Sequence, residues 1–304
     1  MKILILSRSE NGHADLVQSY CANWASVDRI NFDFDKKPPS DLPMILCGNG
    51  TLSEEYEAVF VHHPWIKCNP TWFKDDIEKK LFLASWDSVK EWYEAQLPNA
   101  TWVNRPSASV QSRNVLKQLR LAQGIGFNVP ETLFTNHLES LQVFARDSKV
   151  VIKQGNLGIS IEGKRILTSL IDVGSIGKEM LQGCPCLFQK YLPKQFELRV
   201  HVIGDTVLSC KIDSQKSEKT RIDWRNYDLE NTPHEVFELD DDTRKKCVDI
   251  VKKLSLSFGI IDMIVTPTGE TVFLECNSQG HWAWIEEMTK LPITKTLCDY
   301  ILKK

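Results

Sequence analysis

The clearest hydrophobic pattern along the chain is a pair of short apolar runs near its C-terminal end. Residues 260–265 and 271–274 are rich in β-branched and aromatic side chains, which favour strands. Residues 267–270, with the sequence Pro-Thr-Gly-Glu, separate the runs and carry the proline and glycine of a tight turn. The pattern therefore predicts a β-hairpin.

Three polar side chains interrupt this hairpin: Asp262, Glu275 and Asn277. Side chains alternate between the faces of a strand, so Glu275 and Asn277 share a face, and Asp262 on the partner strand could lie opposite them. Two carboxylates and an amide oxygen suit Mg²⁺, which takes few protein ligands and completes its shell with phosphate oxygens. The alternative is that both acids face water at a sheet edge. We favour the metal site because an unpaired charge inside an apolar strand is costly.

The same periodicity predicts a mixed order of strands and helices before the hairpin. The predicted strands are Lys2–Ser7, Ala58–Val61, Val150–Lys153, Thr206–Ile212 and residues 30–34, 44–47, 165–167, 186–192 and 197–203. The predicted helices are residues 74–97, 109–123, 138–146, 175–181, 240–256, a segment from Pro292, and a first helix that follows the strand Lys2–Ser7. The first helix has an apolar stripe of Val17, Tyr20, Cys21 and Trp24, and the helix at 74–97 has one of Val89, Trp92, Tyr93 and Leu97. Residues 214–231 are polar and without period, so we expect a long mobile loop, as in lids and binding segments.

A lysine ends the predicted strand Val150–Lys153, and glycines follow it at Gly155, Gly158 and Gly163. Glycines let backbone N–H groups approach phosphate oxygens, and the Lys153 ammonium supplies positive charge. The spacing differs from that of a P-loop, so a simple surface turn is the open alternative.

Composition bounds the class of protein. The 304 residues are 42% hydrophobic and 25% charged, which suits a globular protein of two or three compact units. The formal net charge of -3 argues against a nucleic-acid partner, whose binding surface would be basic. We see no transmembrane run and no signal-peptide pattern, and the odd number of nine cysteines with apolar neighbours predicts reduced thiols in a cytoplasmic protein.

From about Asn104 to the C-terminus, the order of these features resembles the ATP-grasp ligases. The resemblance rests on Lys117, Gly124-x-Gly126-x-x-Val129-Pro130-x-Thr132, Val151-Ile152-Lys153, Gln189-Lys190-Tyr191-Leu192, Glu197-x-Arg199, and Asp262 with Glu275-x-Asn277. It implies an α/β (α+β) ATP-grasp fold with three parts. These are an N-terminal pre-ATP-grasp α/β domain (residues 1–105), a central subdomain (106–192) and a C-terminal subdomain with the metal site (193–304), and the nucleotide lies between the last two.

The resemblance also implies ATP and Mg²⁺ as cofactors and a role for each matching residue. Lys117 and Lys153 would hold the nucleotide phosphates, and Glu197 would accept hydrogen bonds from the ribose. The adenine would lie against Gln189, Lys190, Tyr191 and Leu192, and the Mg²⁺ ions would bind Asp262, Glu275 and Asn277.

A narrower resemblance is to the ATP-grasp peptide maturases of the microviridin or graspetide type. It is carried by Glu197-Leu198-Arg199-Val200, Thr220-x-x-Asp223-Trp224-Arg225, and Phe273-Leu274-Glu275-Cys276-Asn277 with Gln279-Gly280-x-Trp282. It implies activation of Asp or Glu side chains of a ribosomally made precursor peptide as acyl-phosphates, and their linkage to Thr or Ser (ester) or Lys (amide). The partner would be a peptide with a leader and an acidic core, and a homodimer is common in this group.

Three basic residues are candidates for the chemistry itself. Arg199 shares a strand face with Glu197, so we assign it to the γ-phosphate or acyl-phosphate, with a salt bridge to a sheet neighbour as the alternative. Arg225 suits a substrate carboxylate, although it could be a solvated loop arginine, and Lys211 is a further candidate. A ligase that joins two separate substrates and a non-catalytic nucleotide-binding module remain alternative functions.

Overall fold

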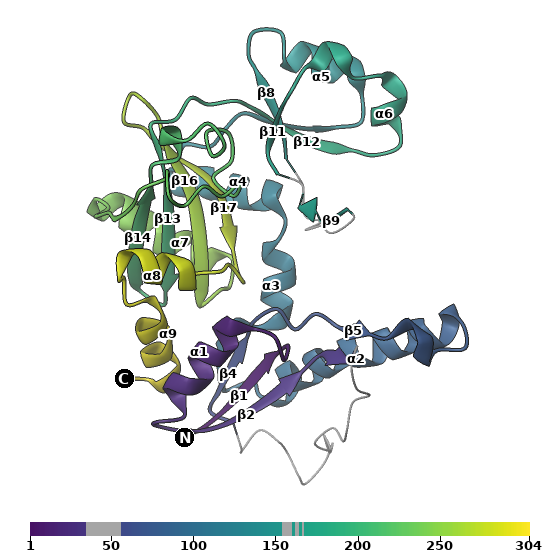
Figure 1. Cartoon of the computed structure of the whole chain (residues 1–304), viewed down its shortest axis with the longest axis vertical. Helices are drawn as coiled ribbons and strands as arrows, with labels where there is room; N and C mark the ends of the chain where they lie inside the picture. The colour runs from purple at the N-terminus through teal and green to yellow at the C-terminus, as the bar shows by residue number, and fades with distance from the viewer. Residues whose placement is uncertain (35–55, 154–159, 162–163, 166) are drawn as a thin grey trace.

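The computed structural model of the chain describes residues 1–34, 56–153, 160–161, 164–165 and 167–304 (Figure 1). The glycines at Gly155, Gly158 and Gly163 and the strand predicted at 44–47 lie outside the described residues.

The N-terminal unit is a parallel sheet in the strand order β2-β1-β4-β6. These strands are β1 (Lys2–Ser7), β2 (Ser26–Asn31), β4 (Ala58–Val61) and β6 (Thr101–Val103). Helices α1 (Gly12–Cys21) and α2 (Asp76–Gln96) contribute buried side chains to separate apolar clusters against β1 and β4, so both strands are buried on both faces. The strand predicted at 30–34 is divided, because β3 (Asp33–Phe34) pairs with β5 (Lys67–Cys68) instead of continuing β2.

Two of the predicted helical stripes include a tryptophan that the structure leaves exposed. Trp24 lies beyond the end of α1 and is 61% exposed. On α2, Val89 and Tyr93 are buried as expected, whereas Trp92 is 54% exposed. A single large apolar side chain on a helix is therefore a weaker guide to the core than a repeated stripe.

The single helix predicted at 109–123 is two helices, α3 (Pro106–Ser112) and α4 (Val115–Ile125). The break has a local cause, because the Asn114 side chain accepts a hydrogen bond from the Lys117 amide at 3.0 Å and caps α4. Gly126 ends α4 in the left-handed conformation, with φ of 98°.

The central unit is an antiparallel sheet in the order β11-β8-β12-β7. Its strands are β11 (Ser169–Ile171), β8 (Val150–Lys153), β12 (Cys186–Lys190) and β7 (Thr132–Thr135). Helices α5 (Leu138–Phe144) and α6 (Lys178–Gln182) bury Leu141 and Leu181 against one face, while a 3-10 turn η3 (Val173–Ser175) precedes α6. The strand expected at 165–167 differs: β10 (Lys164–Arg165) pairs with β9 (Ser160–Ile161), and β11 begins only at Ser169.

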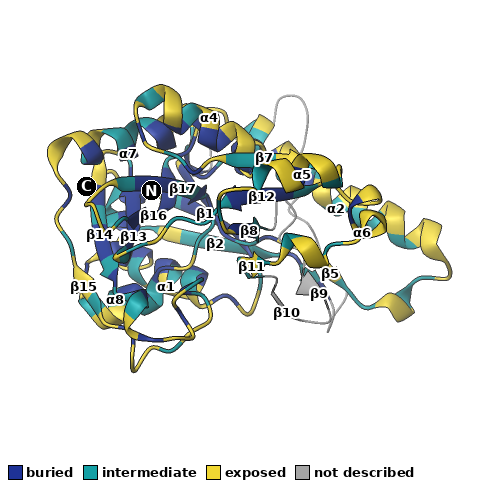
Figure 2. Cartoon of the chain, turned by 90° about the horizontal axis from the view of Figure 1, so that it is seen from above, coloured by how far each residue is buried: buried dark blue, intermediate teal, exposed yellow. Residues whose placement is uncertain are grey.

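The C-terminal unit is an antiparallel five-stranded sheet in the order β15-β14-β13-β16-β17. Its strands are β15 (His234–Val236), β14 (Thr206–Ile212), β13 (Phe196–Ile203), β16 (Phe258–Val265) and β17 (Thr271–Asn277), and β16 with β17 form the predicted hairpin. Helices α4 and α7 (Asp241–Lys253) bury one face, and α8 (Ala283–Thr289) and α9 (Ile293–Leu302) follow the last strand. In Figure 2, buried residues are dark blue, and this colour runs through the strands of the C-terminal sheet.

Residues 214–231 form a long loop, as their composition predicts, but the loop packs part of its side chains into the protein. The segment begins with a 3-10 turn, η4 (Ser214–Lys216), and buries Thr220 and Trp224. The Thr220 hydroxyl donates to the Ser214 carbonyl at 2.8 Å, and Ser217 donates to Asp228 at 2.6 Å. These internal hydrogen bonds satisfy the polar side chains that suggested a mobile loop.

The helices in the described part of the chain lack the combination of length and apolar character that a membrane crossing requires. The cysteines within the described residues are all free thiols, as the composition predicts.

One buried asparagine ties the N-terminal sheet to the C-terminal sheet. Asn104 follows β6, and its amide nitrogen donates to the carbonyls of Phe258 at 2.8 Å and Ser278 at 2.9 Å. Its amide oxygen accepts from the backbone N–H groups of Ser257 and Phe258 at 2.8 and 2.9 Å. The side chain thus joins both strands that carry the predicted metal ligands to the preceding unit.

We expect Asn104→Ala to lower the free energy of unfolding by at least about 2 kcal/mol, because four buried or part-buried backbone groups lose a partner. Urea denaturation measures this. The matched control is Asn128→Ala, whose exposed side chain donates to Glu270 and whose loss should cost less than about 0.5 kcal/mol. Equal effects of the two substitutions would contradict the assignment of Asn104 as a structural tie.

Candidate active site

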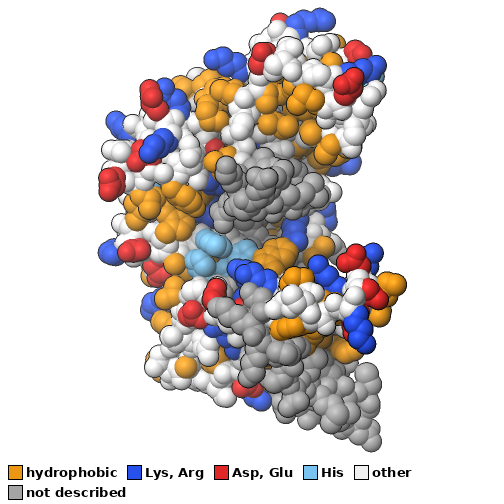
Figure 3. Space-filling view, turned by 45° about the vertical axis from the view of Figure 1, so that its right-hand side comes forward, with side chains coloured by type: hydrophobic (Ala, Val, Ile, Leu, Met, Phe, Trp, Pro, Cys, Tyr) orange, Lys and Arg blue, Asp and Glu red, His pale blue; other side chains and the backbone are white. Residues whose placement is uncertain are grey.

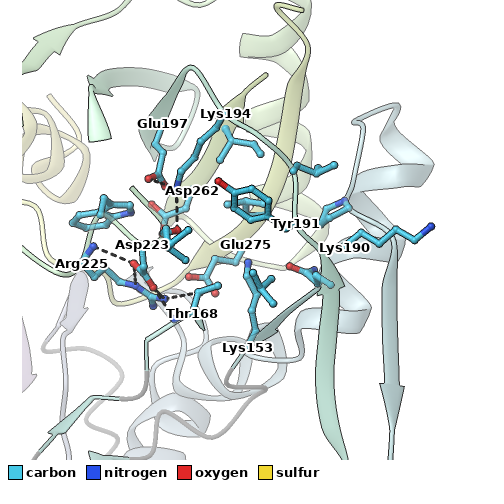
Figure 4. A pocket seen from close by; sticks show the side chains of 18 residues that line it. Lys153, Thr168, Lys190, Tyr191, Lys194, Glu197, Asp223, Arg225, Asp262 and Glu275 are labelled. Carbon is cyan, nitrogen blue, oxygen red and sulfur yellow. Dashed lines mark hydrogen bonds and ion pairs between the residues drawn. The ribbon is translucent and has the colours of Figure 1, made fainter. Parts of the chain in front are cut away.

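A cavity lies between the central sheet and the C-terminal sheet (Figure 4). The central sheet contributes Lys153 and Gln189, and the C-terminal sheet contributes Glu197, Asp262 and Glu275. Its full lining is Pro130, Val151, Lys153, Thr168, Gln189, Lys190, Tyr191, Leu192, Lys194, Glu197, Ile222, Asp223, Trp224, Arg225, Asp262, Ile264, Leu274 and Glu275.

The three side chains predicted as metal ligands come together, and two of them, Asp262 and Glu275, line this cavity. Asp262 on β16 lies directly opposite Glu275 on β17 in the strand register. The Asn277 amide nitrogen lies 3.1 Å from Asp262 Oδ2 and 3.4 Å from Glu275 Oε1. The hairpin therefore brings the two carboxylates and the amide to one face, as strand alternation predicts.

A bulge in β17 shapes this part of the cavity. Asp262 pairs with Glu275 and Met263 pairs with Phe273, which leaves Leu274 without a partner in that register. An extra residue in one strand lets two successive side chains approach the same side. Leu274 and Glu275 accordingly both line the cavity, the first apolar and the second charged.

Asp262 is held by an arginine from the neighbouring strand. Arg199 on β13 pairs with Asp262 in the register, and its Nη1 donates to Asp262 Oδ1 at 2.7 Å. Arg199 Nη2 donates to the carbonyl of His281 at 3.0 Å, and the guanidinium lies 4.9 Å from the centre of the Trp224 ring. Burial raises the pKa of the Asp262 carboxyl, the Arg199 guanidinium opposes that rise, and the Glu275 charge adds to it. A bound cation would favour the ionised form of Asp262.

The donor set fits Mg²⁺ better than a transition metal. Within the part of the chain that the structure describes, no group of three or more His, Cys, Asp or Glu side chains could hold a metal ion. Zinc sites usually take three or four nitrogen or sulfur ligands, whereas Mg²⁺ binds one or two carboxylates with substrate phosphates. Asp262 and Glu275 offer that smaller set of hard oxygens.

Lys153 reaches the cavity from the opposite wall. It ends β8 and points into the cavity beside Glu275 (Figure 4). Burial lowers the pKa of the Lys153 ammonium, while the nearby Glu275 charge opposes that shift. A cation from the central sheet and anions from the C-terminal sheet thus face each other across the space, an arrangement suited to phosphate groups with a metal ion.

The segment predicted to bind adenine forms another side of the cavity. The buried Gln189 donates from Nε2 to Thr132 Oγ1 at 3.0 Å, and Tyr191 and Leu192 line the cavity beyond it. The Lys190 side chain extends away from the cavity (Figure 4) and pairs with Glu131 at 2.8 Å. Successive side chains of β12 face opposite ways, so the Lys190 side chain lies on the face opposite to that of Gln189.

Glu197 has a partner that the sequence analysis missed. Lys194 Nζ lies 2.7 Å from Glu197 Oε1 and also donates to the Ile222 carbonyl at 3.0 Å. Both side chains are buried, and burial raises the pKa of the Glu197 carboxyl although Lys194 opposes it. The spacing Lys194-x-x-Glu197 carries no distinctive signal, because an ion pair at i and i+3 is common on any surface.

Arg225 is held by a second buried carboxylate, Asp223, which the sequence analysis left outside the site. Arg225 donates from Nε to Asp223 Oδ1 at 2.8 Å and from Nη2 to Asp223 Oδ2 at 2.5 Å. The backbone N–H of Thr168 donates to Asp223 Oδ2 at 2.9 Å. Burial alone would raise the pKa of Asp223, but these hydrogen bonds outweigh it and lower the pKa to about 2. The bidentate pair fixes the guanidinium at the cavity wall.

No protein-family model matches the chain, and no curated protein matches it. Solved structures do. A RiPP-associated ATP-grasp ligase of Chryseobacterium gregarium, in complex with ADP and a leader and core peptide, is 25% identical, with a TM-score of 0.86 over 99% of this chain and 96% of that one. The macrocyclase MdnC of Microcystis aeruginosa MRC, bound with precursor peptide MdnA, is 23% identical, with a TM-score of 0.82 over 100% of both chains. The chain has the ATP-grasp fold.

The expected ATP-grasp fold is thus confirmed, and the likeness covers the N-terminal unit as well as the two antiparallel sheets. A third match is the ATP-grasp ligase PsnB, complexed with a variant of its minimal precursor, Mg and ADP. It is 20% identical and has a TM-score of 0.76 over 99% of this chain and 97% of that one.

Four predicted site residues are not part of the cavity lining: Arg199 and Asn277, which are bonded to Asp262, and Lys211 and Lys117, which lie apart from it. Lys211 pairs with Leu198 in the register of β13 and β14, and so it lies on the face opposite to Glu197 and Arg199. It is 3.4 Å from the exposed Glu235, which gives it a surface ion pair. Lys117 is exposed on α4, and among the described residues it is not part of the cavity lining. The structure therefore does not support a catalytic role for Lys211 or a phosphate contact for Lys117.

The buried Asp223 should make stability depend on pH. Because its folded pKa of about 2 lies below the usual value, its contribution is present above about pH 4 and is lost as pH falls toward 2. We expect the difference in unfolding free energy between wild type and Asp223→Asn to shrink by about 2 kcal/mol between pH 5 and pH 2. Chemical denaturation at several pH values measures it. A difference that stays constant over this range would contradict the buried Asp223–Arg225 pair.

Proposed function

We propose that this protein is an ATP-dependent ligase that modifies a ribosomally made precursor peptide. It would activate Asp or Glu side chains of the peptide as acyl-phosphates and join them to a hydroxyl or an amine within the same peptide. The observation that carries the proposal is the cavity with Lys153 on one wall and Asp262 with Glu275 on the other. The protein with the TM-score of 0.86 has the same fold and binds ADP with a leader and a core peptide.

We assign the nucleotide to the space between the two antiparallel sheets. Bound ATP would supply the phosphoryl group, and Mg²⁺ would neutralise charge on its phosphates. Lys153 would hold phosphate oxygens, and Asp262, Glu275 and Asn277 would hold the metal ions. Gln189, Tyr191 and Leu192 would surround the adenine, and Glu197, oriented by Lys194, would accept from the ribose through its second carboxylate oxygen.

The two arginines would serve the carboxylate that reacts. Arg225 lies on the cavity wall with its guanidinium fixed by Asp223, and it would hold the substrate carboxylate toward the γ-phosphate. Arg199 donates a hydrogen bond to the cavity residue Asp262 and would stabilise charge on the phosphate or acyl-phosphate. Phosphoryl transfer requires mainly such positioning and charge neutralisation, and little covalent participation by the protein.

We further propose that a leader segment of the peptide docks on the central unit. The central sheet and its helices expose large apolar side chains, among them Phe134, Val143, Leu170 and Met180. An exposed apolar surface beside a reaction centre suits a peptide segment that must be held but not modified. The free thiols suit a protein of the reducing cytoplasm. A homodimer would agree with the oligomeric state that is common among the graspetide-type maturases.

A ligase that joins two separate small molecules is the second candidate. D-cycloserine synthetase DcsG has the same fold with a TM-score of 0.58 and 12% identity. The peptide ligases have TM-scores from 0.75 to 0.86 over nearly the whole chain, which favours the peptide substrate.

Mass spectrometry tests the proposal. Small acidic peptides encoded beside this gene would each be incubated with the protein, ATP and Mg²⁺. We expect a loss of about 18 Da for each bond formed, because one water is removed as ATP is consumed. A gain equal to an added amino acid would support the second candidate, and ATP binding without turnover on any peptide would contradict a ligase.

Glu275→Gln tests the metal site within the same assay. We expect turnover to fall by at least about a hundred-fold, since one charge that holds Mg²⁺ is removed while the shape of the side chain is kept. The matched control is Glu270→Gln in the exposed hairpin turn, which should leave turnover within about two-fold of wild type. Turnover of Glu275→Gln close to that of wild type would remove Glu275 from the site.

A further inference from the structure

A second cavity, of about 810 Å³, lies between α2, α3 and the segment that follows β4. Its apolar lining includes Val61, Pro64, Trp65 and Val110. In Figure 3, hydrophobic (orange) and basic (blue) side chains lie beside the pale blue histidines in the middle of the molecule. The volume is in the range of ligand pockets, about 300 to 1,000 Å³, and nothing in the proposed function uses this cavity.

The charged side chains of the second cavity are divided between two walls. The α2 wall is mainly acidic, whereas the basic side chains of the opposite wall flank α3. They are Asp87, Lys90, Glu91 and Glu94 on α2, and Arg105 and Arg113 directly before and after α3. A ligand complementary to both walls has an anionic group on the α3 side and hydrogen-bond donors on the α2 side.

Arg113 is the basic residue of this cavity that is best suited to an external anion. Lys90 Nζ pairs with Asp87 Oδ1 at 2.6 Å, and Arg105 Nη2 donates to the Pro98 carbonyl at 2.7 Å. Among the described residues, no carboxylate forms an ion pair with Arg113. Contact with neighbouring atoms lowers the pKa of its guanidinium through desolvation, yet the residue remains exposed and accessible. A carboxylate would repay that desolvation with charge-assisted hydrogen bonds.

Stacking fixes the orientation of the Arg113 guanidinium. Its Cζ lies 4.6 Å from the centre of the Trp65 ring. The Trp65 indole N–H donates to His63 Nδ1 at 2.9 Å, and the backbone N–H of His63 donates to Gln279 Oε1 at 3.2 Å. A guanidinium that stacks through its face keeps the N–H groups at its edge for bidentate bonds to a carboxylate.

A buried hydroxyl lines the same cavity. Ser109 on α3 is 2% exposed, and within the part of the chain that the structure describes its Oγ forms no hydrogen bond. The equally buried Ser112 instead donates from Oγ to the Ser109 carbonyl at 3.0 Å. An unsatisfied buried hydroxyl costs free energy, so Ser109 is suited to donate to an oxygen atom of a ligand.

The second cavity is close to the proposed reaction centre. Gln279, which lines it, follows Asn277 by two residues, so their Cα atoms are at most about 7 Å apart. The Asn277 amide lies 3.1 Å from Asp262 of the nucleotide cavity. A short peptide segment is therefore long enough to reach both cavities.

We propose that the second cavity binds a side-chain carboxylate of the precursor peptide, which accepts from the Arg113 guanidinium and the Ser109 hydroxyl while another carboxylate of the same peptide reacts at the nucleotide. This inference rests on the proposed ligase function. Because the two cavities are a fixed distance apart, Arg113 and Ser109 set which acid of the peptide reaches the γ-phosphate.

A single carboxylate suits this cavity better than a phosphate group. The carboxylates of α2 repel a second negative charge. The apolar side chains of Val61, Pro64 and Val110 suit the methylene groups of Asp or Glu and of neighbouring residues. The α2 carboxylates in turn suit the backbone N–H, hydroxyl or amine groups of the same peptide.

Titration with a capped tripeptide tests the site without ATP or turnover. The probe is acetyl-Ala-Glu-Ala-amide, and acetyl-Ala-Gln-Ala-amide at the same ionic strength is its control. Nitrogen-15 NMR of arginine-labelled protein follows the Nε–H signal of Arg113, which Arg113→Lys assigns by its loss. We expect the Glu peptide to shift this signal and the Gln peptide to leave it in place. No shift with the Glu peptide up to about 50 mM would overturn the proposal.

A double-mutant cycle identifies the carboxylate in the peptide substrate. Each Asp or Glu of the peptide that loses mass in the assay above is replaced in turn by Asn or Gln, and KM and kcat are measured. We expect Arg113→Gln to raise KM at least about ten-fold with kcat within about two-fold. One peptide substitution should raise the KM of wild type equally and leave that of Arg113→Gln unchanged. No such coupling, or coupling to the C-terminal carboxylate only, would overturn the proposal.

Matched variants separate binding from folding. Arg120→Gln removes an exposed arginine of α4 that, among the described residues, lines neither cavity, and it should leave KM within about two-fold of wild type. Ser109→Ala should raise KM about five-fold without lowering the midpoint of urea denaturation. Ser112→Ala should lower the midpoint and leave KM unchanged, because its hydrogen bond is internal. Loss of stability with unchanged KM in Ser109→Ala would overturn the role of its hydroxyl.

Failure of this inference and failure of the ligase function are distinguishable. Ring formation whose KM does not depend on Arg113 overturns the inference and leaves the ligase function intact. If no peptide loses mass with ATP and Mg²⁺, the ligase function fails, and the NMR titration alone judges the second cavity.

Discussion

The structure around the cavity depends on one buried ion pair, Arg199 with Asp262. The two residues are directly opposite in the register of β13 and β16, so the pair follows from the strand alignment and needs no loop to form it. Two charges on adjacent strands of a buried sheet are tolerable only because each neutralises the other. From this pair the site extends in two directions, through Asp262 to Glu275 and Asn277, and through Arg199 to His281 and Trp224.

The hairpin and its polar face could be predicted because strand alternation is a local property. Two apolar runs and a Pro-x-Gly turn fix β16 and β17, and counting by twos places Glu275 and Asn277 together. The same counting needs a register to relate one strand to the next, and the sequence does not supply it. Lys211 lies on the face away from Glu197 and Arg199 for this reason, since its partner in β13 is Leu198 rather than Arg199. The bulge at Leu274 could not be predicted either, because it is a feature of the pairing between β16 and β17.

Partners that depend on long-range contacts lay beyond the sequence. Asp223 is buried and accepts from the backbone N–H of Thr168, which is distant in the chain, whereas polar composition alone suggested a mobile loop there. The break between α3 and α4 was accessible in principle, since Asn114 is a good N-terminal cap. The contacts among His13, His62, His63 and His281 were not, because these residues come from three separate segments and nothing in each segment marks the contact.

The cavity is built with its charges already paired, and this bears on how ligand binding could change it. Glu197 with Lys194, Asp223 with Arg225 and Asp262 with Arg199 each satisfy a buried carboxylate before any nucleotide arrives. Such pairing lowers the cost of keeping ionised groups out of water. On the proposed function, a Mg²⁺ ion at Asp262 would take over part of the role of Arg199. The guanidinium would then have charge to offer a phosphate, while its hydrogen bond to the His281 carbonyl would keep it in place. Metal binding and transition-state stabilisation would in that case share one residue, which ties the order of binding to the order of the chemistry.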